Sequence, residues 1–203
     1  MRKLKFANPK LKTHRPPHIF EDNAVYFITG RTYFGFPHLK DNKIKRYFLE
    51  KLHQSKSKYK FELQGWVVLD NHYHLLVKFG VAQFIARFIK ELHGSTSHFI
   101  RRINSASPEK TGIAQFTARQ LLELKPPPVW YQYLETIIRS EADFYRHLNY
   151  IHQNPVKHGY TQEMGKYQFS SYQYYLKEKG KEWLTDCFRE YPILDFEPKG
   201  GAD

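Results

Sequence analysis

The chain has 203 residues, and its 32 lysines and arginines outnumber its 20 aspartates and glutamates, which gives a formal charge of +12 at pH 7. It is 41% hydrophobic and 17% aromatic, which is enough for a packed core and excludes a mainly disordered protein. The single cysteine excludes a disulfide framework and a cysteine-based zinc site. No apolar run reaches about 18 residues, and the basic N-terminus lacks the apolar stretch of a signal peptide. We therefore expect a cytoplasmic protein with no membrane partner, whose surface favours a polyanion such as nucleic acid.

Local composition divides the chain into three parts. Residues 1–22 are rich in lysine, arginine and proline, and we expect a basic N-terminal arm there. Residues 23–180 carry the hydrophobic patterns of one folded domain, with a polar, proline-rich insertion at 105–129. Residues 181–203 are interpreted as a tail of irregular chain, because the last helical pattern, a short aromatic one, covers Ser171–Lys179.

The first half of the domain predicts a strand, a helix and a hairpin. Ala24–Phe34 is rich in β-branched and aromatic residues, which is typical of a strand inside a sheet. Lys43–Ser57 has apolar residues at helical spacing with its lysines outward, and so predicts an amphipathic helix. Phe61–Leu69 and His72–Phe79 are two predicted strands, and the intervening Asp70-Asn71 tolerates turn geometry.

The second half continues with a helix, a strand and a further helix. Apolar positions from Val81 to Ile103 predict a long helix, and Trp130–Arg139 predicts a strand. Ser140 is expected to cap the next helix, because acidic residues follow it in the first turn. Pro155 is expected to end that helix, because a proline biases the preceding residue away from helical geometry.

These elements follow the order β-α-β-β-α-β, with one extra helix after the last strand. This is the order of ferredoxin-like folds. We therefore predict an α+β protein, in which helices pack on an antiparallel sheet and an extra C-terminal helix carries a tyrosine, Tyr150.

The tripeptide His72-Tyr73-His74 is the sharpest local feature. Alternate residues of a strand share a face, so both imidazoles should project together while Tyr73 points into apolar packing on the other face. Two imidazoles at this spacing can hold one divalent ion, although two ligands do not complete a site. The competing interpretation is that both histidines only form hydrogen bonds at a strand end.

A second feature lies on the helix after Ser140. Tyr150 and Asn154 are four residues apart, beside the predicted buried stripe, so their side chains can address one point. A tyrosine oxygen is a usable nucleophile, and a divalent cation can polarise a phosphodiester. The alternative is an ordinary half-buried helix tyrosine, followed by an asparagine at the helix end.

The residues around both features resemble a known family. His72-Tyr73-His74, preceded by GWVVLDN and followed by an apolar strand, is similar to the histidine-hydrophobic-histidine motif of the HUH single-tyrosine, IS200-like transposases. YIHQNPVKHG, from Tyr150 to Gly159, and the later YQFSSY resemble the signature of the REP-associated tyrosine transposase branch. The resemblance extends from about Val25 to Tyr172, and the connection at 105–129 is longer than in typical members.

The resemblance implies a site and a reaction. It makes Tyr150 the nucleophile, His72 and His74 ligands of Mg²⁺ or Mn²⁺, and Asn154 the third ligand. It implies a metal-dependent single-stranded DNA endonuclease and strand transferase, which forms a 5′-phosphotyrosine intermediate on hairpin-type, REP-like DNA. It also favours a monomer over a dimer.

Contacts to DNA are expected from basic side chains. Phosphate contacts would make binding depend strongly on salt, and exposed aromatic rings would favour unpaired bases. The candidates are Arg31, Arg101, Arg102, Arg139, Lys157 and His158.

Two other function classes stay open at this point. A non-catalytic DNA- or RNA-binding protein would keep the basic surface and cut nothing. A metal-dependent hydrolase that uses an activated water would cut DNA without a protein–DNA adduct. Because histidine binds metal as the neutral imidazole, activity that needs the metal is expected to fall below the ordinary histidine pKa, near 6.5.

Overall fold

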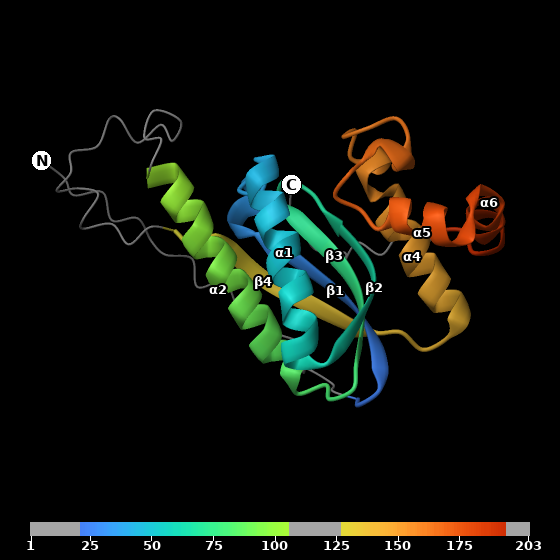
Figure 1. The fold of residues 1–203 in the computed structure, drawn as a ribbon, viewed down its shortest axis with the longest axis horizontal. Helices are drawn as coiled ribbons and strands as arrows, with labels where there is room; N and C mark the ends of the chain where they lie inside the picture. Colours follow the sequence, from blue (N-terminus) through green and yellow to red (C-terminus); the bar gives the residue numbers. More distant parts are fainter. Residues whose placement is uncertain (1–20, 106–126, 194–203) are drawn as a thin grey trace, which may run out of the picture.

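The computed structural model describes residues 21–105 and 127–193. Its centre is a four-stranded antiparallel sheet in the order β2-β3-β1-β4 (Figure 1). The strands are β1 (Ala24–Thr32), β2 (Phe61–Val68), β3 (His72–Phe79) and β4 (Trp130–Ile137), and the helices between them are α1 (Asn42–Tyr59) and α2 (Phe84–Ser105). Element order and strand order are those of a ferredoxin-like fold, so the predicted fold class is confirmed.

The helices lie in two layers on opposite faces of the sheet. The ring of Tyr73 packs against Phe48 of α1. Its hydroxyl forms a hydrogen bond with Nε2 of His93 of α2, at 2.9 Å. The next residue, His74, contacts Tyr150 of α4 (Glu141–Lys157). Because neighbouring residues of a strand face opposite ways, α1 and α2 cover one face and α4 covers the other (Figure 1).

The position of α4 is set at its start and along its buried side. The hydroxyl oxygen of Ser140 accepts a hydrogen bond from the backbone N–H of Asp143, as expected for the cap. Further along, α4 crosses β2 at Gly65, where an added Cβ would lie 3.0 Å from a methyl carbon of Leu148. The absent side chain at Gly65 therefore lets α4 lie close to the sheet.

The expectation that Pro155 ends this helix is wrong. The helix runs on to Lys157, and the backbone N–H of His158 still donates to the carbonyl of Asn154. A proline this near a helix end removes one hydrogen bond. Asn154 and Ile151 are fully buried, so packing against the sheet keeps the last turn helical.

The irregular tail expected after Lys179 is also wrong. The predicted short helix is present as α5 (Tyr172–Lys179), but a further helix, α6 (Lys181–Glu190), follows it. Asn149 of α4 donates hydrogen bonds from Nδ2 to the carbonyl oxygens of Cys187, at 3.0 Å, and Tyr191, at 2.8 Å. The apolar pattern of α6 is short, with only Leu184 and Cys187 buried, so this helix depends on contacts with α4 that the local pattern does not show.

β2 is an edge strand of the sheet, and the segment between α4 and α5 covers its outer edge. The backbone N–H of Val68 donates to Phe169, and the N–H of Ser171 donates to Trp66, both at 2.9 Å. A covered edge cannot pair with another chain.

The basic arm, apart from its last residues, and nearly all of the predicted insertion lie outside the described residues, so the division into arm, domain and tail stays a prediction. In the described part of the chain, no helix has the length and apolar character needed to cross a membrane.

Candidate active site

His72 and His74 lie side by side under α4. Both side chains are buried, and their ring centroids are 5.0 Å apart. The ring of Phe27 stacks on His74 at 5.2 Å with an interplanar angle of 11°. The two imidazoles therefore share one face of the sheet and are fixed by packing.

Each imidazole is held at Nδ1 by a polar neighbour. Nδ1 of His72 lies 2.7 Å from Oδ1 of Asn71, whose own Nδ2 donates to the carbonyl of Gly35 at 3.2 Å. That second bond fixes the amide so that its oxygen faces the ring, which makes Nδ1 of His72 the donor. Nδ1 of His74 lies 2.8 Å from the hydroxyl of Thr29. A neutral imidazole that donates from Nδ1 keeps its lone pair on Nε2.

Nε2 of His72 faces Asn154. Nε2 of His72 lies 3.3 Å from Oδ1 of Asn154, and two atoms with lone pairs repel each other unless a donor or a cation lies between them. Nε2 of His74 and Nδ2 of Asn154 are buried, and neither has a hydrogen-bond partner within the described residues. Buried polar atoms are rarely left without a partner. The two Nε2 atoms and Oδ1 of Asn154 can donate lone pairs to a bound cation, whereas Nδ2 of Asn154 carries N–H groups and needs an acceptor instead.

Burial and nearby positive charge keep both histidines neutral. The loss of solvent is the main cause that lowers the pKa of His72 to about 3, and His158 and Arg31 lower it further. Burial is again the largest cause that holds the pKa of His74 well below its usual value, and His72, His158, Arg31 and His147 lower it further. These lowered pKa values move the expected loss of neutral imidazole from near pH 6.5 to lower pH.

Tyr150 lies beside the second histidine and is almost covered. Its ring centroid is 5.1 Å from that of His74, in an edge contact, and 6.0 Å from that of Phe27. Nζ of Lys157 lies 5.6 Å from the ring centroid of Tyr150. Only 4% of Tyr150 is exposed, so little of this residue is open to a ligand as large as DNA in this conformation.

Three of the six cations predicted to bind DNA lie at this site. Arg31 of β1 is exposed and stands directly opposite His72 in the strand ladder, which places both side chains on the α4 face. The ring centroid of His158 is 5.1 Å from that of His72, and Lys157 covers Tyr150. Arg31, Lys157 and His158 thus form one basic border of the site.

The other three residues predicted to bind DNA lie away from the histidine pair. Arg101 and Arg102 are exposed in the last turns of α2, on the face of the sheet away from α4. Arg139 precedes α4 and forms an ion pair with Glu21 at 2.7 Å. At 1.5 Å per residue, α4 separates its start from Tyr150 by about 14 Å.

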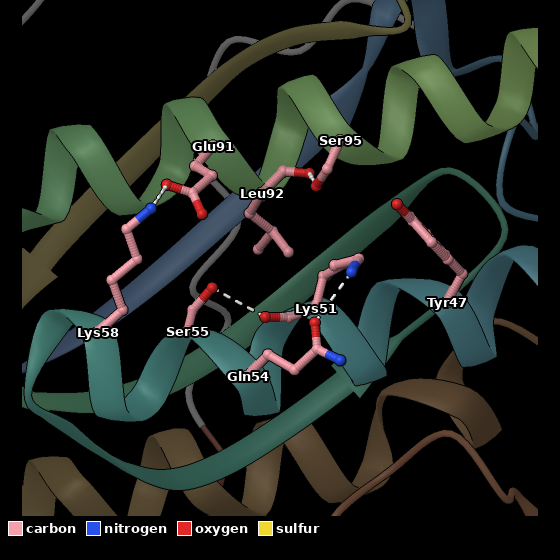
Figure 2. Close-up of a pocket in the computed structure, with 8 residues that line it drawn as sticks. All are labelled: Tyr47, Lys51, Gln54, Ser55, Lys58, Glu91, Leu92 and Ser95. Atoms are coloured by element: carbon pink, nitrogen blue, oxygen red, sulfur yellow. Dashed lines mark hydrogen bonds and ion pairs between the residues drawn. The ribbon is translucent and has the colours of Figure 1, made fainter.

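A separate cavity of about 340 Å³ lies between α1 and α2 (Figure 2). Figure 2 shows an ion pair between Lys58 and Glu91 at one end of it. Its lining residues are Tyr47, Lys51, Gln54, Ser55, Lys58, Glu91, Leu92 and Ser95. None of the residues predicted to act on DNA is among them.

Two residues of the candidate site were missed in the sequence. Thr29 and Asn71 hold the imidazoles, yet the sequence patterns indicate only a turn residue at Asn71 and only a strand residue at Thr29. The contact of Thr29 depends on the pairing of β1 with β3, which no local pattern gives. The position of Asn71 directly before the first histidine was the available signal.

Comparison with known proteins supports the family resemblance found in the sequence. The family model described as "Transposase IS200 like" matches residues 36–118. A putative REP-associated tyrosine transposase of Haemophilus influenzae is 26% identical over 162 residues, covering 72% of this chain and 82% of the relative. The REP-associated tyrosine transposase of Escherichia coli K12 is 25% identical over 158 residues, covering 72% of this chain and 79% of the relative.

In sequence, the chain is similar to the REP-associated tyrosine transposases. The family resemblance found in the sequence is thereby confirmed, and it supports a DNA-processing enzyme. A solved structure described as a REP-associated tyrosine transposase bound to a REP hairpin shares the fold. It has a TM-score of 0.61 and 20% identity, and the match covers 81% of this chain and 86% of that one.

In residues 21–105 and 127–193, no three His, Cys, Asp or Glu side chains cluster as a metal site. A metal site at His72 and His74 would therefore need the amide of Asn154.

Proposed function

We propose that this protein cuts single-stranded DNA next to a hairpin and rejoins it, with Tyr150 as the nucleophile. The observation that carries the proposal is the contact of Tyr150 with His74, one of a pair of buried imidazoles whose Nδ1 atoms are already engaged. A relative of similar fold is described as bound to a REP hairpin, which supports hairpin-type, REP-like DNA as the substrate.

The proposed reaction exchanges one phosphoester for another. The Tyr150 oxygen loses its proton and attacks phosphorus, a bond from that oxygen to phosphorus forms, and the bond to the 3′ oxygen of the preceding nucleotide breaks. The departing oxygen takes up a proton and becomes a free 3′-hydroxyl. The 5′-phosphotyrosine keeps the phosphodiester energy, so a 3′-hydroxyl can reverse the step and join a strand without ATP.

The neighbouring residues bind and orient the reacting groups. Arg31, Lys157 and His158 would hold phosphates by charge. His72, His74 and Asn154 would hold Mn²⁺ or Mg²⁺, and a bound ion would stabilise negative charge on a phosphate oxygen as a Lewis acid. Two nitrogen ligands favour Mn²⁺ over Mg²⁺, because Mg²⁺ prefers oxygen.

The test is an adduct assay with DNA labelled at either end. A hairpin oligonucleotide with unpaired flanks is incubated with the protein and Mn²⁺ and run on a denaturing gel. A 3′ label should appear on a covalent protein–DNA species, and a 5′ label on a shorter free strand. Tyr150→Phe, which removes one oxygen, should abolish both products.

The matched control is Tyr145→Phe on the same helix, since Tyr145 packs against Trp183 and Tyr191, away from the histidines. This variant should keep both products. Adduct formation by Tyr150→Phe at the parent rate would show that another group is the nucleophile.

The burial of Tyr150 favours one alternative, a nucleic-acid-binding protein that cuts nothing. Such a protein would retain the hairpin on a native gel and give neither product with any flank. A third outcome, cut DNA that never carries protein, would indicate a hydrolase that uses water. The adduct assay separates these classes.

A further inference from the structure

An unusual turn follows β1. The chain forms a short 3₁₀ helix at Tyr33–Gly35, in which Phe34 has a φ of 51° and a ψ of 22°. A bulky residue with positive φ is strained by about 1–3 kcal/mol. The turn also exposes 76% of the Phe34 ring to solvent. Strain and exposure of one large apolar side chain both oppose stability, so this turn calls for a functional explanation.

Neighbouring rings extend Phe34 into a patch. Its ring centroid lies 4.4 Å from that of Tyr33 and 6.4 Å from that of Phe36, and the Tyr33 centroid lies 6.3 Å from that of Tyr131 at the start of β4. Phe36 is 52% exposed and Tyr131 is 44% exposed. Tyr33, Phe34, Phe36 and Tyr131 are called the aromatic patch below. Single exposed apolar residues are ordinary, but contiguous ones mark a binding surface.

The aromatic patch is joined to the candidate active site. The carbonyl of Gly35, inside the turn, accepts a hydrogen bond from Asn71, and the oxygen of Asn71 faces Nδ1 of His72. Arg31, two residues before the patch begins, stands opposite His72 in the ladder. Rings, cation and histidines thus occupy the same end of the sheet.

This composition fits unpaired bases. Proteins that bind single strands combine positive charge along the backbone with aromatic rings on which bases stack. Paired bases inside a duplex do not offer free faces for such stacking. A strand whose phosphate reaches Tyr150 would pass Arg31, and its neighbouring bases would then meet the rings.

We propose that the aromatic patch stacks unpaired bases that flank the hairpin, and that Phe34 and Phe36 contribute most of this binding. The inference rests on the proposed function for its substrate. It concerns binding and not cleavage, so it can be tested without the reaction.

The experiment measures the contribution of an unpaired flank to affinity. Fluorescence anisotropy compares one hairpin with an unpaired flank on its 5′ side, on its 3′ side and on neither side, in protein that carries Tyr150→Phe so that no strand is cut. Phe34→Ala should weaken the affinity for a flanked hairpin about 10-fold, because one base loses its stacking partner. Adding Phe36→Ala should weaken this affinity further. The hairpin without a flank should bind all variants equally.

Two further variants separate stacking from altered folding. Phe34→Trp should keep the affinity, and its added fluorescence should be quenched by the flanked hairpin alone. Tyr174→Ala removes a ring that is 56% exposed on α5, outside the patch, and should change nothing.

Equal binding of the flanked hairpin by the parent and the double alanine variant would overturn the inference, as would the same loss for all three hairpins or in Tyr174→Ala. Self-association of the parent that Phe34→Ala abolishes, with flank binding unchanged, would instead assign the patch to a second copy of this chain. Flank binding that needs the patch, together with no adduct in the cleavage assay, would keep this inference and reject the proposed chemistry.

Discussion

At the scale of single residues, the two imidazoles are aimed by side chains that the motif does not contain. Thr29 and Asn71 each engage an Nδ1 atom, and Nε2 of His72 faces Asn154. Partners of this kind fix the orientation and tautomer of histidine ligands. A histidine pair without them would have to lose rotational freedom when it binds an ion.

Thr29→Val, which keeps the shape and removes the hydroxyl, should therefore weaken Mn²⁺ binding about 10-fold or more. Isothermal titration of the DNA-free protein with MnCl₂ measures this directly. Thr136→Val is the matched control, because Thr136 is exposed on β4. An unchanged affinity in Thr29→Val would show that the hydroxyl does not position His74.

At the scale of elements, the strand that carries the histidines is fixed from its other face. The ring of Tyr73 lies over Gly30 of β1, where an added Cβ would lie 2.3 Å from a ring carbon. Phe48, Trp130 and His93 surround the same ring, so it cannot move aside. Only glycine at position 30 allows this close approach.

Gly30→Ala should consequently lower the free energy of unfolding by about 1–3 kcal/mol, as overpacking of a core does. Urea denaturation followed by circular dichroism measures the change. Gly94→Ala gives the opposite control, because a Cβ at this position of α2 meets nothing within 4 Å and alanine stabilises a helix by about 0.5–1 kcal/mol. Equal stability of Gly30→Ala and the parent would mean that β1 and β3 can shift apart.

The sequence predicts these elements unevenly. The alternation around His72 and His74 and the cap at Ser140 are local signals, and the observed elements follow them. The end of α4 beyond Pro155 and the existence of α6 depend on contacts between helices and sheet, which local rules do not include. Phe34 is similar, because its apolar character indicates a buried strand, whereas the turn at Tyr33 places the ring in solvent.

At the scale of the whole molecule, buried neutral histidines couple stability to pH. His152 of α4 is fully buried, and its Nε2 lies 3.0 Å from the hydroxyl of Ser171, which ties α4 to the segment along β2. Loss of solvent lowers the pKa of His152 to about 3. In the unfolded chain the same group titrates near 6.5, so between these values the unfolded state binds more protons.

The stability that neutral His152 contributes is present above pH 6.5 and is lost as the pH falls toward 3. Between pH 7 and pH 5 this one group should cost about 2 kcal/mol of unfolding free energy. His152→Gln, which keeps a polar group for Ser171, should reduce the pH slope by nearly one proton. Urea denaturation at pH 5, 6 and 7 measures it, and an unchanged slope would place the proton uptake elsewhere.

The coverage of Tyr150 has a consequence for selectivity. If the proposed chemistry holds, the protein must exchange between a closed state, in which Tyr150 is covered, and an open state, in which Tyr150 is accessible. A DNA strand that binds both states equally well does not change their populations, however tightly it binds. Only DNA with contacts specific to the open state shifts the population toward attack. A nucleophilic residue that is 4% exposed would then protect bystander strands from nicking and would make cleavage depend on which strand is bound.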